Sequence, residues 1–230
     1  MPGTAERKRR LQLHSMNWNR PLPPPATDPS PDTPHTLSPT QKARLRNREC
    51  RHLYSGSRFQ GTQKSGRCSY NVTVQIQHVD LDTSFLCGYL HIEGLTEEWP
   101  TLCTFFEAEI VGDRYSFLTK KWDADADVDR MHWTKFPAFE PYQECFASEN
   151  FQCDNTNANV LFMRWKEHFL VPDHRIETIT GASFAGFYYI AYDRTAGTLV
   201  GYYYHKSSEK FQRLSLRHQS ERHFGVYEFR

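Results

Sequence analysis

The sequence lacks the features that secretion and membrane insertion require. Its 230 residues contain no apolar run of about 18 residues, the length that a helix needs to cross a membrane. The first residues also lack the apolar stretch of a secretory signal peptide. We therefore expect a cytoplasmic protein with no membrane span. Its six cysteines are then expected to be reduced thiols, and none of them shows the C-x-x-C spacing typical of a structural zinc site.

Motifs of common enzymes are missing as well. The sequence has no G-x-S-x-G nucleophile motif, no H-E-x-x-H metal motif and no Gly-rich phosphate loop. His78, His91, His205 and His218 show no two-residue or four-residue metal spacing with one another. Since no nucleophile or metal cluster is recognisable, we expect a protein that is not an enzyme and that binds no metal, cofactor or nucleic acid.

Proline and positive charge are concentrated in one part of the chain. Nine of the 13 prolines precede residue 40. Residues 1–52 carry 10 Lys and Arg against 4 Asp and Glu, whereas the rest carries 18 against 23. Residues 1–52 also have no periodic apolar segment, so we expect a disordered basic tail followed by one folded domain, residues 53–230. Within the tail, Arg7-Lys8-Arg9-Arg10 is a candidate nuclear import signal.

The folded part is rich in aromatic side chains and in short alternating segments. Apolar Tyr70, Val72, Val74 and Ile76 alternate with polar neighbours, which is the pattern of a half-buried strand. Turn residues separate similar runs, and strands do not alternate with helices. The sequence predicts an all-β fold, either a closed antiparallel barrel or a sandwich, with one helical insertion. The expected strands are residues 70–77, 84–92, 102–111, 117–121, 160–170, 182–192, 198–207 and 211–217, and the expected helix is residues 128–136.

The segment before the expected helix is rich in aspartate. Asp123, Asp125 and Asp127 resemble the start of a calcium loop, but an EF-hand would need Gly and Glu where the chain has Val128 and Thr134. Carboxylates near a helix N-terminus are stabilised by the helix dipole. We therefore interpret the segment as a helix start and not as a metal site.

One charged residue does not fit its strand. In residues 160–170 one face is apolar and is expected to point inward, yet Glu167 lies within it. A buried carboxylate must be paired, protonated or available to a cationic ligand, because an unpaired buried charge costs several kcal/mol. Two interpretations stay open: an internal salt bridge, or a recognition acid at the floor of a barrel mouth. The inward face comprises Leu161, Met163, Trp165, Glu167 and Phe169, and the aromatic residues on adjoining strands are Phe184, Tyr188 and Tyr203.

Several segments of the folded part are similar to one protein family. They run from Tyr54 to the C-terminus and do not include residues 1–50. On these segments the chain resembles the substrate-receptor subunit of the GID/CTLH ubiquitin ligase, the vacuolar import and degradation family. The segments are Tyr54-Ser55-Gly56-Ser57, Cys87-Gly88-Tyr89-Leu90, Gly94-Leu95-Thr96-Glu97-Glu98, Lys121-Trp122-Asp123-Ala124-Asp125, Phe162-Met163-Arg164-Trp165-Lys166-Glu167, Gly181-Ala182-Ser183-Phe184-Ala185-Gly186-Phe187-Tyr188-Tyr189 and Tyr227-Glu228-Phe229-Arg230.

The resemblance implies a fold and a function. The fold would be a closed antiparallel β-barrel of about eight strands with helical insertions and long loops at the open end. The protein would be a non-catalytic receptor that binds proteins with an N-terminal proline, so that the attached ligase ubiquitinates them for proteasomal degradation. The C-terminal residues Tyr227, Phe229 and Arg230 would dock on an armadillo-like scaffold subunit of the ligase.

The resemblance also implies roles for individual residues. Glu167 and Tyr188 would contact the N-terminal amine of the ligand, and Gln63 and Ser183 would hydrogen-bond to its backbone. Gln63 falls in residues 61–69, which depart from the family pattern and are expected to form a mobile loop. The pocket wall would comprise Val72, Leu90, Ile92, Leu95, Leu102, Leu170, Phe184 and Tyr203, with Gln212 on a neighbouring loop.

Two other functions stay open on the sequence. A lipocalin-like barrel would use Glu167 as a polar anchor for a small apolar ligand. An enzyme would need a partner for Glu167 that the sequence does not identify. Titration with a Pro-Gly-starting peptide and its N-acetylated form distinguishes these functions, because only a receptor for free N-termini loses affinity on acetylation.

Overall fold

The structure, a computed structural model, describes residues 52–148, 155, 158–171, 173–180, 182–208 and 211–220. These residues all belong to the second of the two units into which the chain divides, Pro39–Arg230. The expected basic tail up to residue 51 and the expected docking residues Tyr227, Phe229 and Arg230 lie outside the described residues. None of the helices in the described part is long and apolar enough to pass through a membrane.

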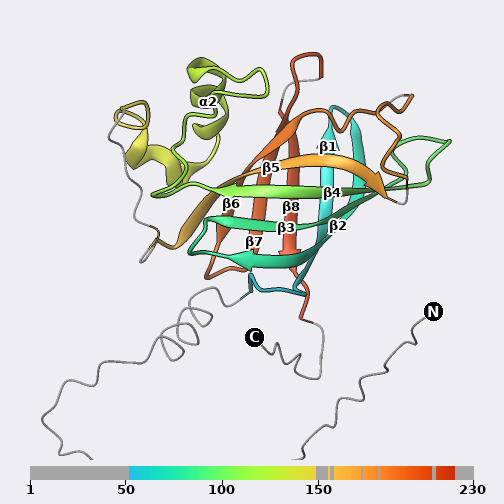
Figure 1. The fold of residues 1–230 in the computed structure, drawn as a ribbon, viewed down its shortest axis with the longest axis horizontal. Coiled ribbons are helices and arrows are strands. Elements are labelled where there is room, and N and C mark those ends of the chain that lie inside the picture. Colours follow the sequence, from blue (N-terminus) through green and yellow to red (C-terminus); the bar gives the residue numbers. More distant parts are fainter. Residues whose placement is uncertain are drawn as a thin grey trace, which may run out of the picture. The chain divides into compact units, whose positions relative to one another are not determined.

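Eight strands form a closed antiparallel barrel (Figure 1). Each strand pairs with the next one along the chain, and β8 closes the barrel against β1. The all-β prediction is confirmed, and of its two alternatives the barrel is the correct one. The strands are β1 (Arg58–Ser65), β2 (Cys68–Asp80), β3 (Phe85–Glu93), β4 (Thr101–Ile110), β5 (Val160–Val171), β6 (Phe187–Asp193), β7 (Thr198–Tyr204) and β8 (Gln212–His218).

Alternating side chains fill the interior of the barrel. In β2, Val72, Val74 and Ile76 are buried and the residues between them are more exposed, as the sequence pattern predicts. β7 alternates in the same way, with Leu199 and Tyr203 buried. The inward faces pack into one apolar cluster, so the interior is a filled core over most of its length. This cluster includes Phe59, Leu86, Phe106, Met163, Trp165, Ile190 and Leu214.

A helical insertion between β4 and β5 covers part of the outer surface of the barrel. It contains α2 (Ala126–Trp133) and the 3-10 helix η1 (Pro137–Tyr142), both drawn beside the barrel in Figure 1. Asp125 caps α2, because its side chain accepts a hydrogen bond from the N–H of Val128 at 2.9 Å. The aspartate-rich segment is thus a helix start, although the helix lies earlier than residues 128–136. Beneath the insertion is a second core formed by Phe117, Trp133, Phe136, Phe139, Phe146, Phe162, Phe187 and Tyr189.

Some expected strand boundaries are wrong. The sequence does not predict β1, because only Phe59 and Gln63 are buried in it. Gly61 lets β1 approach β8 closely, since a Cβ atom there would meet the backbone oxygen of Ser215 at 1.9 Å. Gln63 therefore lies in a strand and not in the expected loop. Residues 117–121 form no strand, and β6 begins at Phe187, later than residue 182.

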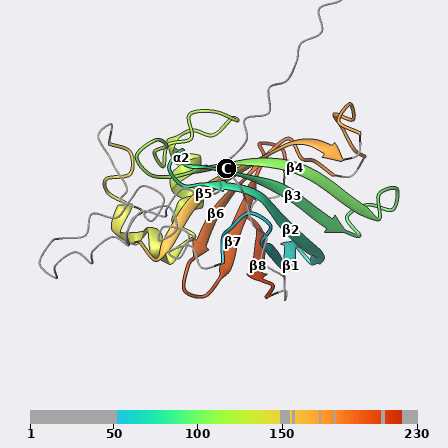
Figure 2. The same cartoon turned by 60° about the horizontal axis from the view of Figure 1, so that its bottom comes forward.

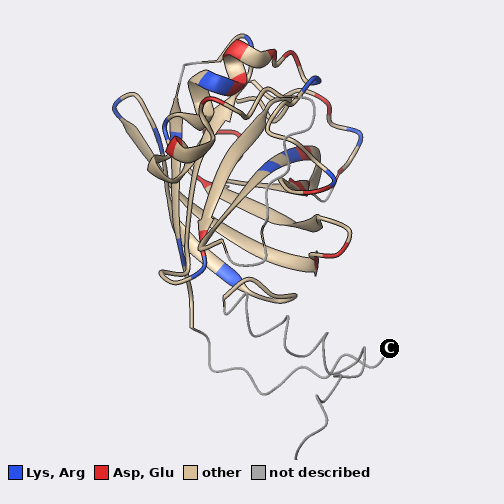
Figure 3. Ribbon diagram, turned by 90° about the vertical axis from the view of Figure 1, so that its left-hand side faces the viewer, with Lys and Arg blue, Asp and Glu red and all other residues tan. Residues whose placement is uncertain are grey.

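Charged residues lie mostly in the loops and in the helical insertion. In Figure 3 the strands of the barrel are mostly tan, and red and blue gather around the insertion and at the turns. Arg164 is an exception, because it is buried on the outer face of β5. Its guanidinium pairs with Glu109 at 3.1 Å and donates to the backbone oxygen of Ser116 at 2.8 Å. These contacts satisfy the charge of Arg164 beneath the insertion.

Candidate functional site

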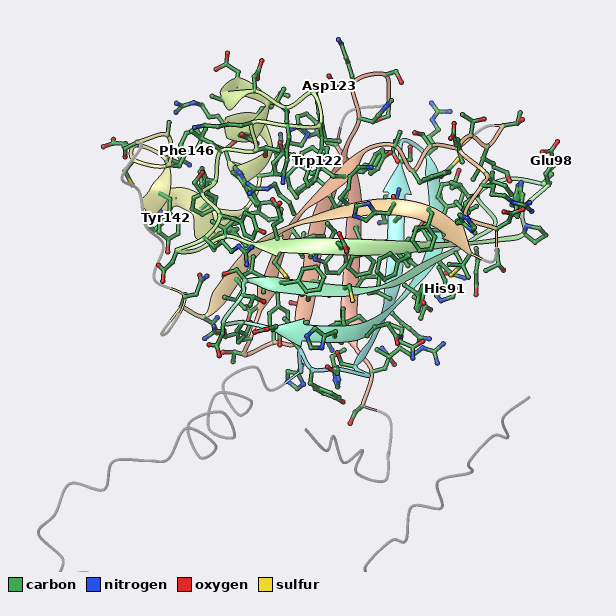
Figure 4. All side chains as sticks on the ribbon, viewed as in Figure 1. His91, Glu98, Trp122, Asp123, Tyr142 and Phe146 are labelled. Atoms are coloured by element: carbon green, nitrogen blue, oxygen red, sulfur yellow. The ribbon has the colours of Figure 1, made fainter. Side chains whose placement is uncertain are left out.

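A cavity of about 340 Å³ opens at one end of the barrel. Every strand contributes at least one side chain to its lining. The loop between β3 and β4 and the loop between β5 and β6 project on the same side of the barrel (Figure 2). In Figure 4, Glu98 of the first loop lies far from Tyr142 and Phe146 of the helical insertion. No residue of the insertion lines the cavity in the described part of the chain, whereas the two loops and the turn after β7 all contribute to its lining.

The cavity brings together most of the residues that the family resemblance implies. Val72 and Leu90 instead lie in the packed core of the barrel, and Leu170 packs against Leu102 and Phe184. The remaining ten all line the cavity: Gln63, Ile92, Leu95, Leu102, Glu167, Ser183, Phe184, Tyr188, Tyr203 and Gln212.

The sequence does not predict every lining residue. Tyr70 lies on the same face of β2 as Val72, so the two-residue period could have identified it. The expected strand 198–207 ends earlier, because β7 stops at Tyr204 and His205, Ser207 and Ser208 lie in the turn after it. Their imidazole and hydroxyl groups make part of the wall polar, and Oγ of Ser207 lies 3.0 Å from Nδ1 of His205. The other unpredicted lining residues are Ser65 and Ala182.

A β-bulge in β5 lies directly after Glu167, which itself faces inward in phase with Met163 and Trp165. Phe105 of β4 pairs with Phe169, but the next residue of β4 pairs with Glu167, so His168 is an extra residue in β5. Because of this extra residue, both Glu167 and Leu170 are buried while His168 is exposed. The expectation that Phe169 points inward is wrong for the same reason: the bulge shifts the two-residue period by one. Phe169 lies on the outer surface, stacked on Phe105 with 5.1 Å between the ring centroids.

Glu167 is buried without a charged partner. Its side chain is 3% exposed, and Oε1 accepts a hydrogen bond from Oγ1 of Thr104 at 2.5 Å. The adjacent Lys166 points elsewhere, because its Nζ donates to the backbone oxygens of Glu167, Ala185 and Gly186 at 2.8, 2.9 and 3.1 Å. Among the described residues, no Lys, Arg or His side chain lies within 4.0 Å of the Glu167 carboxylate. The described part of the chain therefore does not supply the internal salt bridge that the sequence left open.

Burial changes the ionisation of Glu167 and of its neighbours. It raises the pKa of Glu167 from the usual 4.5 to about 7, although the Thr104 hydrogen bond and the charge of Lys166 lower it. Burial and the charge of Glu167 raise the pKa of Tyr203 to about 12 and also raise the pKa of Tyr188. The two phenols consequently keep their protons at neutral pH. A cation in the cavity would favour the ionised form of Glu167.

A chain of hydrogen bonds orients the polar groups beside Glu167. The hydroxyl of Tyr188 donates to Oε1 of Gln63 at 2.9 Å. Nε2 of Gln63 in turn donates to Oε1 of Gln212 at 3.2 Å. Since the Tyr188 proton points to Gln63, the lone pairs of the Tyr188 oxygen remain available as acceptors. The chain thus gives the cavity a second acceptor in addition to Glu167.

Tyr203 holds the loop that precedes β6 against the cavity. Its hydroxyl accepts a hydrogen bond from the N–H of Gly186 at 2.9 Å and donates to the backbone oxygen of Ser183 at 3.0 Å. This anchor keeps Ser183 and Phe184 in the wall. Phe184 then joins an apolar cluster at the mouth with Leu95, Trp99, Leu102, Leu170, Ile176 and Ile179.

The arrangement suits a ligand that is both cationic and apolar. One carboxylate oxygen and one phenol oxygen accept hydrogen bonds, and aliphatic and aromatic side chains surround them. In the part of the chain that the structure describes, no group of three or more His, Cys, Asp or Glu side chains is placed to hold a metal ion.

The sequence matches known proteins along most of the folded part. The family model described as vacuolar import and degradation protein matches residues 52–219. The Mus musculus protein named glucose-induced degradation protein 4 homolog is 58% identical over 179 residues, which cover 77% of this chain and 82% of the relative. The GID complex substrate-recognition subunit 4 of Schizosaccharomyces pombe is 36% identical over 191 residues, covering 78% of this chain and 98% of the relative. The GID complex substrate-recognition subunit 4 of Saccharomyces cerevisiae is 34% identical over 223 residues, covering 72% of this chain and 62% of the relative.

Proposed function

The chain belongs to the vacuolar import and degradation protein family, and on that basis we propose that it is the substrate receptor of a multisubunit GID-type ubiquitin ligase. It binds proteins that begin with proline and holds them for ubiquitination and proteasomal degradation in the cytoplasm. The receptor is a non-catalytic subunit. Two relatives with the printed name of substrate-recognition subunit 4 support this assignment.

The buried carboxylate of Glu167 is the observation on which the proposed ligand rests. An ionised carboxylate that is 3% exposed needs a countercharge, and no cationic side chain of the described residues lies within 4.0 Å of it. The ammonium group at the start of a peptide supplies this charge and donates directly to the free oxygen of Glu167. Charge-assisted hydrogen bonds of this kind are about twice as strong as neutral ones. The site therefore selects ligands that have a free N-terminus.

The number of acceptors favours proline as the first residue. A secondary ammonium has two N–H donors, whereas a primary ammonium has three. Oε2 of Glu167 and the oxygen of Tyr188 can accept both protons of an N-terminal proline. The rigid pyrrolidine ring loses little conformational entropy when it contacts the aliphatic wall around Ile92 and Leu102. Gln63 and Ser183, which also line the cavity, bind the peptide backbone that follows.

Isothermal titration with a Pro-Gly-starting peptide and its N-acetylated form tests this function. The free peptide should bind, and acetylation should weaken binding by about 2 to 5 kcal/mol because it leaves Glu167 desolvated without a countercharge. A Ser-Gly-starting peptide of the same remaining sequence measures the preference for proline. Equal affinity of the free and the acetylated peptide would refute the amine site and would instead fit a barrel that binds small apolar ligands.

The contact with the ligase is proposed to use the C-terminal residues. Tyr227, Phe229 and Arg230 dock on an armadillo-like scaffold subunit, and the sequence resemblance supports this role. Removal of Phe229 and Arg230 should abolish binding to the scaffold in a pull-down and leave peptide affinity unchanged. Loss of both scaffold binding and peptide binding would show that the C-terminal residues act in folding and not in docking.

A further inference from the structure

Thr104 contacts Glu167 but has no role in the proposed ligand contacts. It lies in β4, is 1% exposed and donates its hydroxyl proton to Oε1 of Glu167 at 2.5 Å. We propose that Thr104 is a positioning residue that keeps the carboxylate of Glu167 ionised and leaves its other oxygen for the ligand. This inference rests on the proposed function for its ligand, although the state of Glu167 can be measured without any ligand.

The register of β4 and β5 brings the two side chains together. Thr104 pairs with Leu170 across the strands, and Phe106 pairs with Glu167. The inward residues are therefore two apart in β4 but three apart in β5, since the bulge at His168 adds one residue. Without that extra residue, Glu167 would still face inward in phase with Met163 and Trp165, but Leu170 would point to the outer surface. The register thus brings the inward-facing Thr104 next to the inward-facing Glu167 on the neighbouring strand.

The other donors around Glu167 are committed to different acceptors. The Tyr188 proton goes to Oε1 of Gln63, and the Tyr203 proton goes to the backbone oxygen of Ser183. Nζ of Lys166 donates to three backbone oxygens. Among the described residues, Thr104 is consequently the one side chain that donates to Glu167.

Two further titratable side chains share the cavity with Glu167. Tyr70 and His205 line it, from β2 and from the turn after β7. The His205 ring lies beside Ser207, and no hydrogen bond joins it to Glu167 within the described residues. A His205→Asn variant therefore measures any contribution of His205 to the pH dependence of binding.

Loss of the Thr104 hydroxyl should favour the protonated form of Glu167. A hydrogen bond from a donor stabilises the charged carboxylate more than the neutral acid, so it lowers the pKa of Glu167 against the larger effect of burial. Without this hydrogen bond, Glu167 is protonated in a larger fraction of the molecules. It must release that proton before a cationic ligand can bind. Affinity should then fall most at and below neutral pH and recover as the pH rises.

The test compares Thr104→Val, which removes the donor at nearly constant volume, with Thr104→Ser, which keeps it. The carboxyl carbon of Glu167 is titrated by NMR in the absence of ligand. Thr104→Val should raise the titration midpoint by about one pH unit, and Thr104→Ser should restore it. Thr119→Val is the matched control, because Thr119 donates its hydroxyl proton to another buried carboxylate, that of Asp129. It should leave the Glu167 titration unchanged.

Peptide titration at several pH values completes the test. Thr104→Val should bind a Pro-Gly-starting peptide about threefold more weakly than the wild type near pH 7.5, and the difference should shrink at higher pH. An unmoved Glu167 midpoint, or an equal loss of affinity at every pH, would overturn the positioning role. If the wild type bound no such peptide, the proposed function would fail, but the ligand-free titration would still decide the role of Thr104. Urea unfolding of each variant identifies any that fails to fold.

Discussion

Two carboxylates are buried in the described part of the molecule, and their surroundings differ. Asp129 lies beneath the helical insertion and Glu167 lies in the cavity, with exposed fractions of 0% and 3%. Asp129 accepts hydrogen bonds from the N–H of Thr119 at 2.7 Å, from the Thr119 hydroxyl and from the Tyr189 hydroxyl at 2.8 Å. Glu167 accepts one, from Thr104. Burial raises the pKa of both groups.

The difference separates a structural carboxylate from a binding one. The donors around Asp129 come from the insertion loop and from the outer face of β6, so this carboxylate ties the insertion to the barrel. Glu167 keeps one oxygen without a partner among the described residues, beside an open cavity. An incomplete hydrogen-bond shell around a buried charge is unfavourable for folding and becomes favourable only when a ligand completes it.

Replacing Asp129 should have the largest effect, and the effect should be on stability. In Asp129→Ala the N–H and hydroxyl of Thr119 and the hydroxyl of Tyr189 lose their acceptor inside the protein. The free energy of unfolding in urea should fall by about 4 kcal/mol. Peptide affinity of the folded fraction should not change, because the site lies on the other side of the barrel wall.

The control for this prediction is Asp127→Ala on the same helix. Asp127 is exposed in the first turn of α2, so its replacement should change stability by no more than about 0.5 kcal/mol. Similar losses in the two variants would show that the three hydrogen bonds to Asp129 contribute little to holding the insertion.

Replacing Glu167 should lower peptide affinity and raise stability, the reverse of the effect of replacing Asp129. Glu167→Gln keeps the shape of the side chain but removes the charge that a peptide amine needs, so affinity for a Pro-Gly-starting peptide should fall by about 3 kcal/mol. The same change should raise stability. Since folding raises the pKa of Glu167 from 4.5 to about 7, its ionisation opposes folding. That cost is absent below about pH 4.5, grows with pH and is complete above about pH 7.

Calorimetry and urea unfolding at pH 4 and pH 8 measure the two effects of Glu167→Gln. The stabilisation should be larger at pH 8. Glu107→Gln is the control, because Glu107 lies on the outer face of β4 with its side chain 49% exposed. It should change neither affinity nor stability appreciably. A Glu167→Gln protein that binds the peptide as well as the wild type would contradict the assignment of the amine site.

The sequence predicts the parts of this fold that carry a local signal. The alternation in β2 and the misplaced charge at Glu167 are both visible in it, because burial on one face imposes a two-residue period. β1 carries no such signal, with only Phe59 and Gln63 buried. Its place is fixed by pairing with β8, more than a hundred residues away in the chain, which no local pattern encodes.

The same limit applies to the site. Glu167 and Tyr188 are predicted from the strand pattern and the family resemblance, but the contact between Thr104 and Glu167 depends on the register of two strands. The bulge at His168 exists only in relation to β4, so a period counted along β5 alone puts Phe169 on the wrong face. The turn that contains His205 falls within the expected strand of residues 198–207, but β7 ends at Tyr204. The pairing of strands in space, and not the type of residue, determines these positions.

Peptide binding should weaken in acid because of Glu167. With its pKa raised to about 7, Glu167 is mostly ionised at pH 7.5 and mostly protonated at pH 6, whereas an ammonium ligand requires the ionised form. Affinity should therefore fall about tenfold, or about 1.4 kcal/mol, between these two pH values. Asp129 should not contribute, because it does not face the ligand. The decline in affinity should persist in His205→Asn. It should disappear from the residual binding of Glu167→Gln. A decline in affinity that disappears in His205→Asn instead would show that Glu167 stays ionised.

The smallest expected effects come from two adjacent tyrosines on opposite faces of β6. Tyr188 faces the cavity and Tyr189 donates to Asp129. Tyr188→Phe removes one acceptor for the ligand, so affinity for a Pro-Gly-starting peptide should fall by about 1 kcal/mol. Tyr189→Phe removes one of the donors to Asp129, so stability should fall by a similar amount while affinity stays unchanged. If each substitution altered both quantities equally, the two carboxylate sites would be coupled through β6, and the division into a structural and a binding carboxylate would be wrong.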